Sequence, residues 1–133
     1  MLTDGGLYTS TIVLKRRSGG GTGKIVLRSQ TLPCIEGIQV HPSMWTTQAE
    51  LRQTAGGFGP IIMTEQGGIA LCDNYMLVGL NITSTSSDTN SLVQFGDGGG
   101  NQNTFAKVPQ NLWMDRCQAI GLNARRAVGL HSG

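Results

Sequence analysis

The sequence predicts an all-β protein, an antiparallel β-sandwich or jelly-roll-like barrel of about seven to nine short strands with one short helix. The first observation is the glycine content, because 20 of the 133 residues are glycine and the average share is about 7%. Most of these glycines form clusters between short apolar runs, at residues 5–6, 19–23, 56–59, 67–68 and 96–100. Glycine favours turns because it adopts positive φ without steric cost. The second observation is that turn signals recur roughly every 8–12 residues, as in sandwiches and barrels, and no internal repeat is convincing enough to indicate a solenoid.

The N-terminal part reads as a long-tipped hairpin over about residues 8–28. The β-branched stretch Tyr8 to Lys15 and the stretch Lys24 to Arg28 both have strand-like patterns, and the glycine-rich segment RRSGGGTG separates them. The tip of this hairpin would carry three basic side chains away from the body of the protein: Arg16, Arg17 and Lys24.

The middle of the chain predicts one strand and the single helix. Cys34 to Val40 alternates around Gly37, as a strand with a bulge would. Beyond Pro42, three side chains fall at helical spacing (Met44, Gln48 and Leu51), and the helix they predict ends at Gly56.

The second half of the chain predicts most of the strands. The best candidate is Tyr75 to Thr85, in which apolar residues occupy alternate positions as in a half-buried sheet. The other candidates are Ile61 to Thr64, Ile69 to Cys72, Leu92 to Phe95, Thr104 to Val108, Cys117 to Asn123 and Ala127 to Leu130.

Composition predicts one domain over residues 1–133 with a largely neutral polar surface, since only 14% of the residues are charged. Such a surface is poorly protected against association by charge repulsion, which favours a homo-oligomer, a trimer first, or a place in a larger assembly. Positive charge gathers near both ends of the sequence and negative charge in the middle. These segments can therefore pair within a fold or between subunits.

The cysteines predict no disulfide framework and no metal site. Cys34, Cys72 and Cys117 are odd in number and widely spaced, and His41 and His131 show no zinc-type spacing relative to them. We expect small buried thiols in a protein made in a reducing cytoplasm. The N-terminus lacks the pattern of a signal peptide, and no apolar run is long enough to span a membrane.

Two glycine-rich segments invite ligand hypotheses. The segment around Lys24 is not a phosphate-binding loop, because Ser18 and Ile25 stand where that motif requires glycine and Ser or Thr. The segment Asp97 to Asn103 holds oxygen-bearing side chains that could partly wrap a calcium ion. It has too few carboxylates for a calcium loop, and a hairpin or assembly loop is favoured. No cofactor is expected.

Catalytic and nucleic-acid functions find little support. The carboxylates are scattered and none lies close in sequence to a histidine, so a hydrolase would need carboxylates that meet only in space. Arg16-Arg17 and Arg125-Arg126 lack the interleaved aromatic residues of a nucleic-acid platform. The two tryptophans, Trp45 and Trp113, are candidate anchors for a partner or a sugar.

The C-terminal part resembles small β-sandwich virion proteins of tailed bacteriophages, the decoration (cement) or minor capsid class. The resemblance rests on the strand MLVGLNIT, the stretch LVQFGDGGGNQNTFAKVP and the closing segment WMDRCQAIGLNARRAVGL, about 55 residues in all. It departs from the pattern at Lys107 to Gln110, where such proteins often have a proline-glycine turn.

The resemblance implies a non-enzymatic virion protein that binds and stabilises a phage capsid, with the major capsid protein or other virion proteins as partners. The residues expected to contact partners are Arg16, Arg17, Lys24, Trp45, Trp113, Asp97 and Asn101. The alternative is a carbohydrate- or receptor-binding module of a head fibre or tail, with the tryptophans and the loop from Asp97 as its site. Neither membrane nor nucleic acid is an expected partner.

Overall fold

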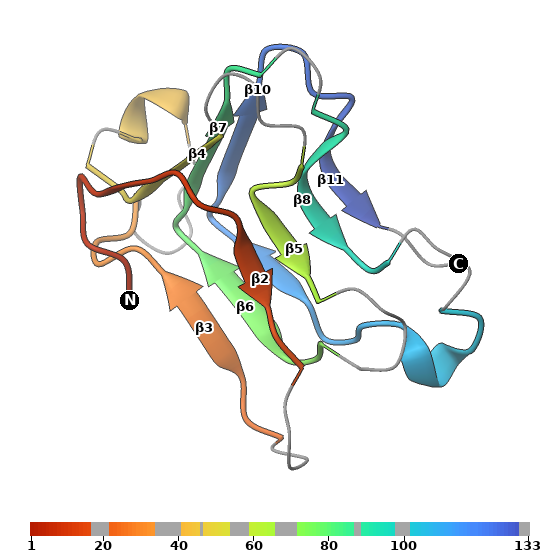
Figure 1. Cartoon of the computed structure of the whole chain (residues 1–133). Helices are drawn as coiled ribbons and strands as arrows, with labels where there is room; N and C mark the ends of the chain where they lie inside the picture. Colours follow the sequence, from red (N-terminus) through yellow and green to blue (C-terminus); the bar gives the residue numbers. More distant parts are fainter. Residues whose placement is uncertain are drawn as a thin grey trace.

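The chain folds into a stack of β-coils with three sides (Figure 1). The computed structural model describes residues 1–16, 22–33, 41–45, 47–53, 59–65, 72–86, 89–97 and 102–130. Within these residues, each of the first three turns of the chain lays one strand on each of three sheets, and a fourth turn lays strands on two of them.

Four successive coils contain the strands. The first coil holds β1 (Leu7–Tyr8), β2 (Ile12–Leu14) and β3 (Ile25–Arg28), and the second holds β4 (Glu50–Gln53), β5 (Ile62–Thr64) and β6 (Tyr75–Val78). The third holds β7 (Asn81–Ser84), β8 (Ser91–Phe95) and β9 (Trp113–Asp115), and the fourth holds β10 (Gln118–Gly121) and β11 (Arg126–Leu130). Two short 3-10 helices, η1 (Pro42–Met44) and η2 (Phe105–Lys107), lie between strands.

The strands form three sheets, which we number by their first strand. Sheet 1 has the order β1-β4-β7-β10, sheet 2 the order β11-β8-β5-β2, and sheet 3 the order β3-β6-β9. All the strand pairings described are parallel. This arrangement is a parallel β-helix, in which each coil pairs only with the coils before and after it.

The core lies inside the coils, where in-register side chains from successive coils stack on one another. Leu51 of β4 lies beside Ile82 of β7 on sheet 1, and Ile62 of β5 lies beside Val93 of β8 on sheet 2; all four are fully buried. On sheet 3, Leu77 of β6 fills the same role. Because strand side chains alternate between two faces, Arg52 and Thr83 of sheet 1 and Met76 of sheet 3, next to these core residues, point outward.

A glycine makes the corner between sheet 3 and sheet 1. Gly79 joins β6 to the segment before β7 with a φ of 62°, a backbone conformation that residues other than glycine rarely adopt. The buried hydroxyl of Ser29 donates to the Gly79 carbonyl at 2.6 Å and accepts from the Ala49 N–H at 3.1 Å. One side chain thereby connects the corners of neighbouring coils.

The predicted antiparallel sandwich or barrel is wrong, because the sheets are parallel. The predicted hairpin over residues 8–28 is wrong for the same reason: β2 pairs with β5 and β3 pairs with β6, so the two strands belong to different sheets. The structure also corrects the expectation that no convincing repeat is present, since the first three coils repeat the same three-sided path.

Several element predictions are also corrected. In place of a helix from Met44, η1 ends there and the strand β4 follows, because Leu51 and Gln53 alternate into the interior. Tyr75 to Thr85 is two strands bent at Gly79. Thr104 to Val108 contains η2 in place of a strand.

Four strand predictions are confirmed in place, at β5, β8, β10 and β11. The predicted strand Cys34 to Val40 and the first three residues of Ile69 to Cys72 lie outside the described residues.

Candidate protein-binding surface

A row of apolar side chains runs across the outward side of sheet 3. Val26 of β3, Met76 of β6 and Trp113 of β9 lie in register on neighbouring strands, and we call these three side chains the apolar row. They point outward because Leu27, Leu77 and Met114, one position further along each strand, belong to the core cluster or pack against it. Val26 is 44% exposed and Trp113 is 53% exposed. The row therefore places apolar surface in water.

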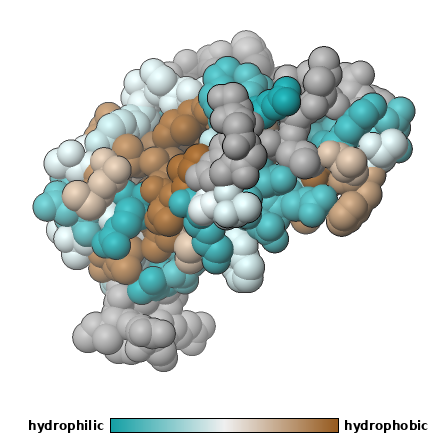
Figure 2. Space-filling model, turned by 90° about the horizontal axis from the view of Figure 1, so that it is seen from below, coloured by the Kyte–Doolittle hydropathy of each residue, from teal (hydrophilic) through white to brown (hydrophobic). Residues whose placement is uncertain are grey.

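The apolar row belongs to a wider pattern of exposed hydrophobic side chains. Hydrophobic side chains gather into a continuous area on the face seen from below, with polar side chains around it (Figure 2). The exposed large hydrophobic residues of the described chain are Met1, Leu7, Val13, Val26, Phe105, Trp113, Ile120, Leu122, Val128 and Leu130. Contiguous exposed apolar surface in a soluble protein commonly marks a site of interaction.

A lysine lies over the indole ring of the row. The Lys24 ammonium, just before β3, is 4.9 Å from the centroid of the Trp113 ring on β9, so it meets the ring across the intervening strand β6. A cation over an exposed tryptophan contributes roughly 0.5–1 kcal/mol. It also covers part of one face of the ring.

The outward side of sheet 1 has a different character. On β4, Arg52 forms two hydrogen bonds with Glu50, with Nε to Oε1 at 2.9 Å and Nη2 to Oε2 at 2.7 Å, and the Thr83 hydroxyl of β7 donates to Glu50 Oε1 at 2.6 Å. Gln118 Nε2 of β10 donates to Asn81 Oδ1 of β7 at 3.2 Å. Burial raises the pKa of Glu50, but the hydrogen bonds from Arg52 and Thr83 and the charge of Arg52 outweigh it and leave the pKa below its usual value. Most polar groups on this side thus bind one another.

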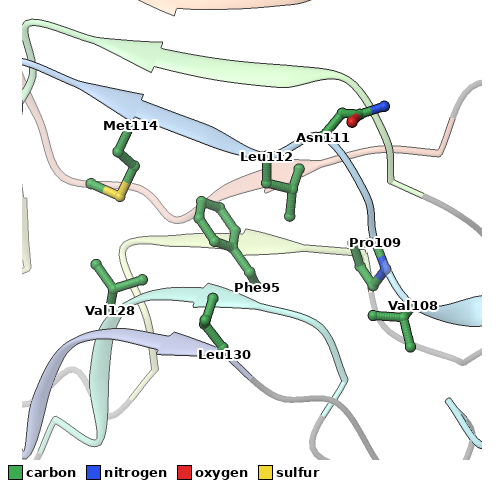
Figure 3. Close-up of a pocket in the computed structure, with 8 residues that line it drawn as sticks. All are labelled: Phe95, Val108, Pro109, Asn111, Leu112, Met114, Val128 and Leu130. Carbon is green, nitrogen blue, oxygen red and sulfur yellow. The ribbon is translucent and has the colours of Figure 1, made fainter. Parts of the chain in front are cut away.

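An apolar cavity opens at the fourth coil, between β9 and β11. Its volume is about 540 Å³. It is lined by Phe95, Val108, Pro109, Asn111, Leu112, Met114, Val128 and Leu130 (Figure 3). Met114 and Leu112 border it on one side and Val128 and Leu130 on the other, with Phe95 between them. The strand β9 therefore separates two surfaces, because Trp113 faces outward in the apolar row and Met114 faces the cavity.

Of the seven residues that the sequence singles out for partner contacts, the structure brings Lys24 and Trp113 together. Arg16 is tied to the body of the protein through its main chain, since its N–H donates to Glu65 Oε2 at 3.0 Å. The Lys15 ammonium binds Glu65 Oε1 at 2.9 Å. The hydrogen bonds from the Arg16 N–H and from Lys15 lower the pKa of Glu65.

The other four residues lie apart from the apolar row or outside the description. Trp45 follows η1 and is half-buried. Asp97 is buried, and its N–H donates to Gln102 Oε1 at 2.9 Å. Arg17 and Asn101 are outside the described residues.

Sequence reasoning missed Val26 and Met76. A signal for Val26 is present in the stretch KIVLR, because a strand that buries Ile25 and Leu27 must turn Val26 outward. Met76 could not be placed in the row from the sequence, because its neighbours on sheet 3 come from other coils.

The described residues offer no group of three or more His, Cys, Asp or Glu side chains that could hold a metal ion. Cys72 and Cys117 are free thiols, and burial raises the pKa of each. Cys34 is not among the described residues. Among the parts of the chain that the structure covers, no helix is long and apolar enough to cross a membrane.

Comparison with known proteins finds no match for this chain among protein-family models, curated proteins or solved structures.

Proposed function

We propose that this chain is a non-enzymatic structural protein that binds another protein through the apolar row and Lys24, and that its setting is a virion, where it attaches to and stabilises a phage capsid. The observation that carries the binding function is the apolar row itself. It sets Val26, Met76 and Trp113 in register on the solvent side of a sheet, where the equivalent side of sheet 1 is mainly polar.

The chemistry of this surface suits a protein partner. Tryptophan is among the residues that most often dominate binding energy at protein interfaces, and it does so when neighbouring apolar side chains exclude water around it. Val26 and Met76 supply that surrounding. Lys24 adds a positive charge at the edge of the row, which would favour an acidic rim on the partner.

The virion setting comes from the resemblance of the C-terminal part to phage virion proteins. The sandwich fold that the resemblance implied is wrong, so the setting rests on the sequence pattern and the binding function on the surface. The mechanism is selective binding. A protein that binds the assembled shell and not its free subunits stabilises the shell by about 2.7 kcal/mol per site when its concentration is about 100 times Kd.

The carbohydrate-binding alternative is less well supported by the geometry. A sugar stacks on the face of an aromatic ring, and the Lys24 ammonium already lies over the Trp113 ring at 4.9 Å. The neighbour of Trp113 in register on β6 is the apolar Met76, whereas sugar sites need convergent hydrogen-bonding groups.

Co-sedimentation of the purified chain with capsids of the phage that encodes it tests the proposal. Trp113→Ser should weaken binding by about 30-fold, as loss of an interface anchor worth about 2 kcal/mol predicts. Ile120→Ser is the matched control, because Ile120 is 49% exposed and points outward on sheet 1 in register with Thr83. It should bind like the parent chain.

Three results would contradict the proposal. The first is equal loss of capsid binding in both variants, and the second is no capsid binding by the parent chain. The third is saturable glycan binding that Trp113→Ser abolishes in the absence of capsid binding, which would assign the surface to a sugar. Circular dichroism of each variant shows that it is folded.

A further inference from the structure

Among the described residues, the fourth coil has strands on two of its three sides. Sheets 1 and 2 have four strands each, whereas sheet 3 has three, so β9 is the outermost strand of sheet 3 in the described chain. On the earlier coils this place is filled: β6 pairs in parallel with β3, and β9 pairs in parallel with β6.

The side chains next to the unfilled third side of the fourth coil occupy positions that are buried in the preceding coil, yet here they are exposed. Val128 and Leu130 of β11 lie in register with Val93 and Phe95 of β8. Val93 is fully buried and Phe95 is 8% exposed, but Val128 is 38% exposed and Leu130 is 78% exposed. The difference follows from position in the stack, because nothing in the described chain covers the fourth coil from above.

The cavity of about 540 Å³ lies under this place, with Leu112 and Met114 on the β9 side and Val128 and Leu130 on the β11 side (Figure 3). We propose that the open end of the fourth coil accepts an extended strand of a partner polypeptide, which pairs in parallel with β9 and inserts apolar side chains into this cavity. This site is separate from the apolar row, which lies on the other side of β9.

The stack itself specifies the chemistry of the strand. Residues that pair next to Leu112 and Met114 must be apolar, because those positions face the interior. A residue that pairs next to Trp113 points outward and is free to be polar. The occupant is therefore a strand of alternating character whose main chain supplies the pairing and whose inward side chains supply selectivity.

A strand explains the geometry better than a small apolar ligand does. A small molecule could fill the cavity, but it would leave the main-chain groups on the free edge of β9 without a strand partner. An added strand covers both the cavity and the edge, as β9 itself does for β6.

A peptide with the sequence of residues 110–116 is a suitable probe, because that segment already occupies the third side of the preceding coil. Titrated into the isotope-labelled chain, it should shift the NMR signals of the β9 amides and of the methyl groups of Met114, Val128 and Leu130. A peptide with aspartate in place of its Leu112 and Met114 should bind at least tenfold more weakly. A peptide with serine in place of its Trp113 should bind like the first.

Variants of the protein locate the site. Leu130→Asp should weaken peptide binding at least tenfold, and the fold should survive because this side chain is already largely exposed. Ile120→Asp, at an exposed position on sheet 1, should bind the peptide normally. Both should keep the β-sheet circular dichroism of the parent chain.

Three results would overturn the proposal. They are the absence of any shift at millimolar peptide, equal binding of the aspartate-substituted peptide, and self-association of the chain that Leu130→Asp abolishes while the peptide does not compete. Capsid binding by the apolar row can fail or succeed independently, since Trp113→Ser changes that surface and leaves the cavity intact.

Discussion

Sheets 1 and 3 have the same architecture and opposite outer surfaces. On sheet 1 the outward groups of neighbouring coils bind one another, as Glu50 with Arg52 and Thr83 shows. On sheet 3 the outward groups at the same kind of position are Val26, Met76 and Trp113. Leu7 and Ile120, on the first and last strands of sheet 1, are the apolar exceptions. The difference teaches that the coil geometry does not dictate the character of the outer surface, so the apolar row needs an explanation of its own, and partner binding is the one we propose.

The sharpest test separates the two sides of a single strand. Leu77→Ala, on the inward side of β6, should lower the free energy of unfolding by about 3 kcal/mol because it leaves a cavity in a fully packed core. Met76→Ala, one position away and outward in the apolar row, should lower it by about 1 kcal/mol or less. Urea unfolding followed by circular dichroism measures both. Equal losses would mean that the apolar row is part of the folded core and not a free surface.

The next test concerns the corner that joins the two sheets. Gly79→Ala should cost about 2 kcal/mol, since the φ of 62° strains any other residue and the new Cβ would lie 2.8 Å from Leu32 Cδ2. Gly23→Ala is the matched control, because no heavy atom lies within 4 Å of its new Cβ. The control should change stability by less than about 0.5 kcal/mol in the same unfolding experiment. A neutral Gly79→Ala would show that the corner is built differently.

The hydrogen bonds of Glu50 on the outward side of sheet 1 can be tested by changing the pH. The pKa of Glu50 in the folded chain lies below its ordinary value of 4.5. Its carboxylate therefore stabilises the fold above that pH and loses this contribution as the pH falls from 4.5 through the folded pKa. Glu50→Gln should cost on the order of 1 kcal/mol at pH 7, and the cost should shrink as the pH falls below 4.5. Unfolding free energies of both proteins across that range measure the difference, and a cost that does not depend on pH would exclude the ionised hydrogen bonds as its source.

The smallest expected effect lies in the apolar row. A double-mutant cycle with Lys24→Ala and Trp113→Ala should give a coupling energy of about 0.5 kcal/mol, because the ammonium-ring contact is exposed. The measurement is the free energy of unfolding of the four proteins at low salt. A coupling of zero would leave Lys24 as a solvated charge beside the row.

Strand positions could be predicted from the sequence far better than strand partners. The stretches that became β5, β8, β10 and β11 show their β-branched or apolar character locally, so they were found. Their partners lie one coil away, and no local pattern reports that distance. The sequence also hides the repeat, because Tyr8, Leu51, Ile82 and Ala119 occupy equivalent positions at unequal intervals.

The candidate surface could be predicted from the sequence to a similar extent. Lys24 and Trp113 could be singled out because a cation in a glycine-rich segment and a tryptophan are conspicuous residue types. That they lie 4.9 Å apart depends on the order β3-β6-β9, which only the folded stack supplies. Met76 completes the row for the same reason, through its register with Val26 and Trp113.

The open fourth coil also shapes how the chain loses structure. A stack in which each coil pairs only with its neighbours behaves as a one-dimensional chain of units, and a unit at the end has one neighbour to stabilise it where an inner unit has two. Local opening should therefore start in the first and fourth coils and move inward, so amide hydrogens exchange fastest at these two ends and slowest in the second and third coils. A strand bound along β9 would slow amide exchange in the fourth coil. Hydrogen exchange would then report both the binding of the strand and the added stability of this end.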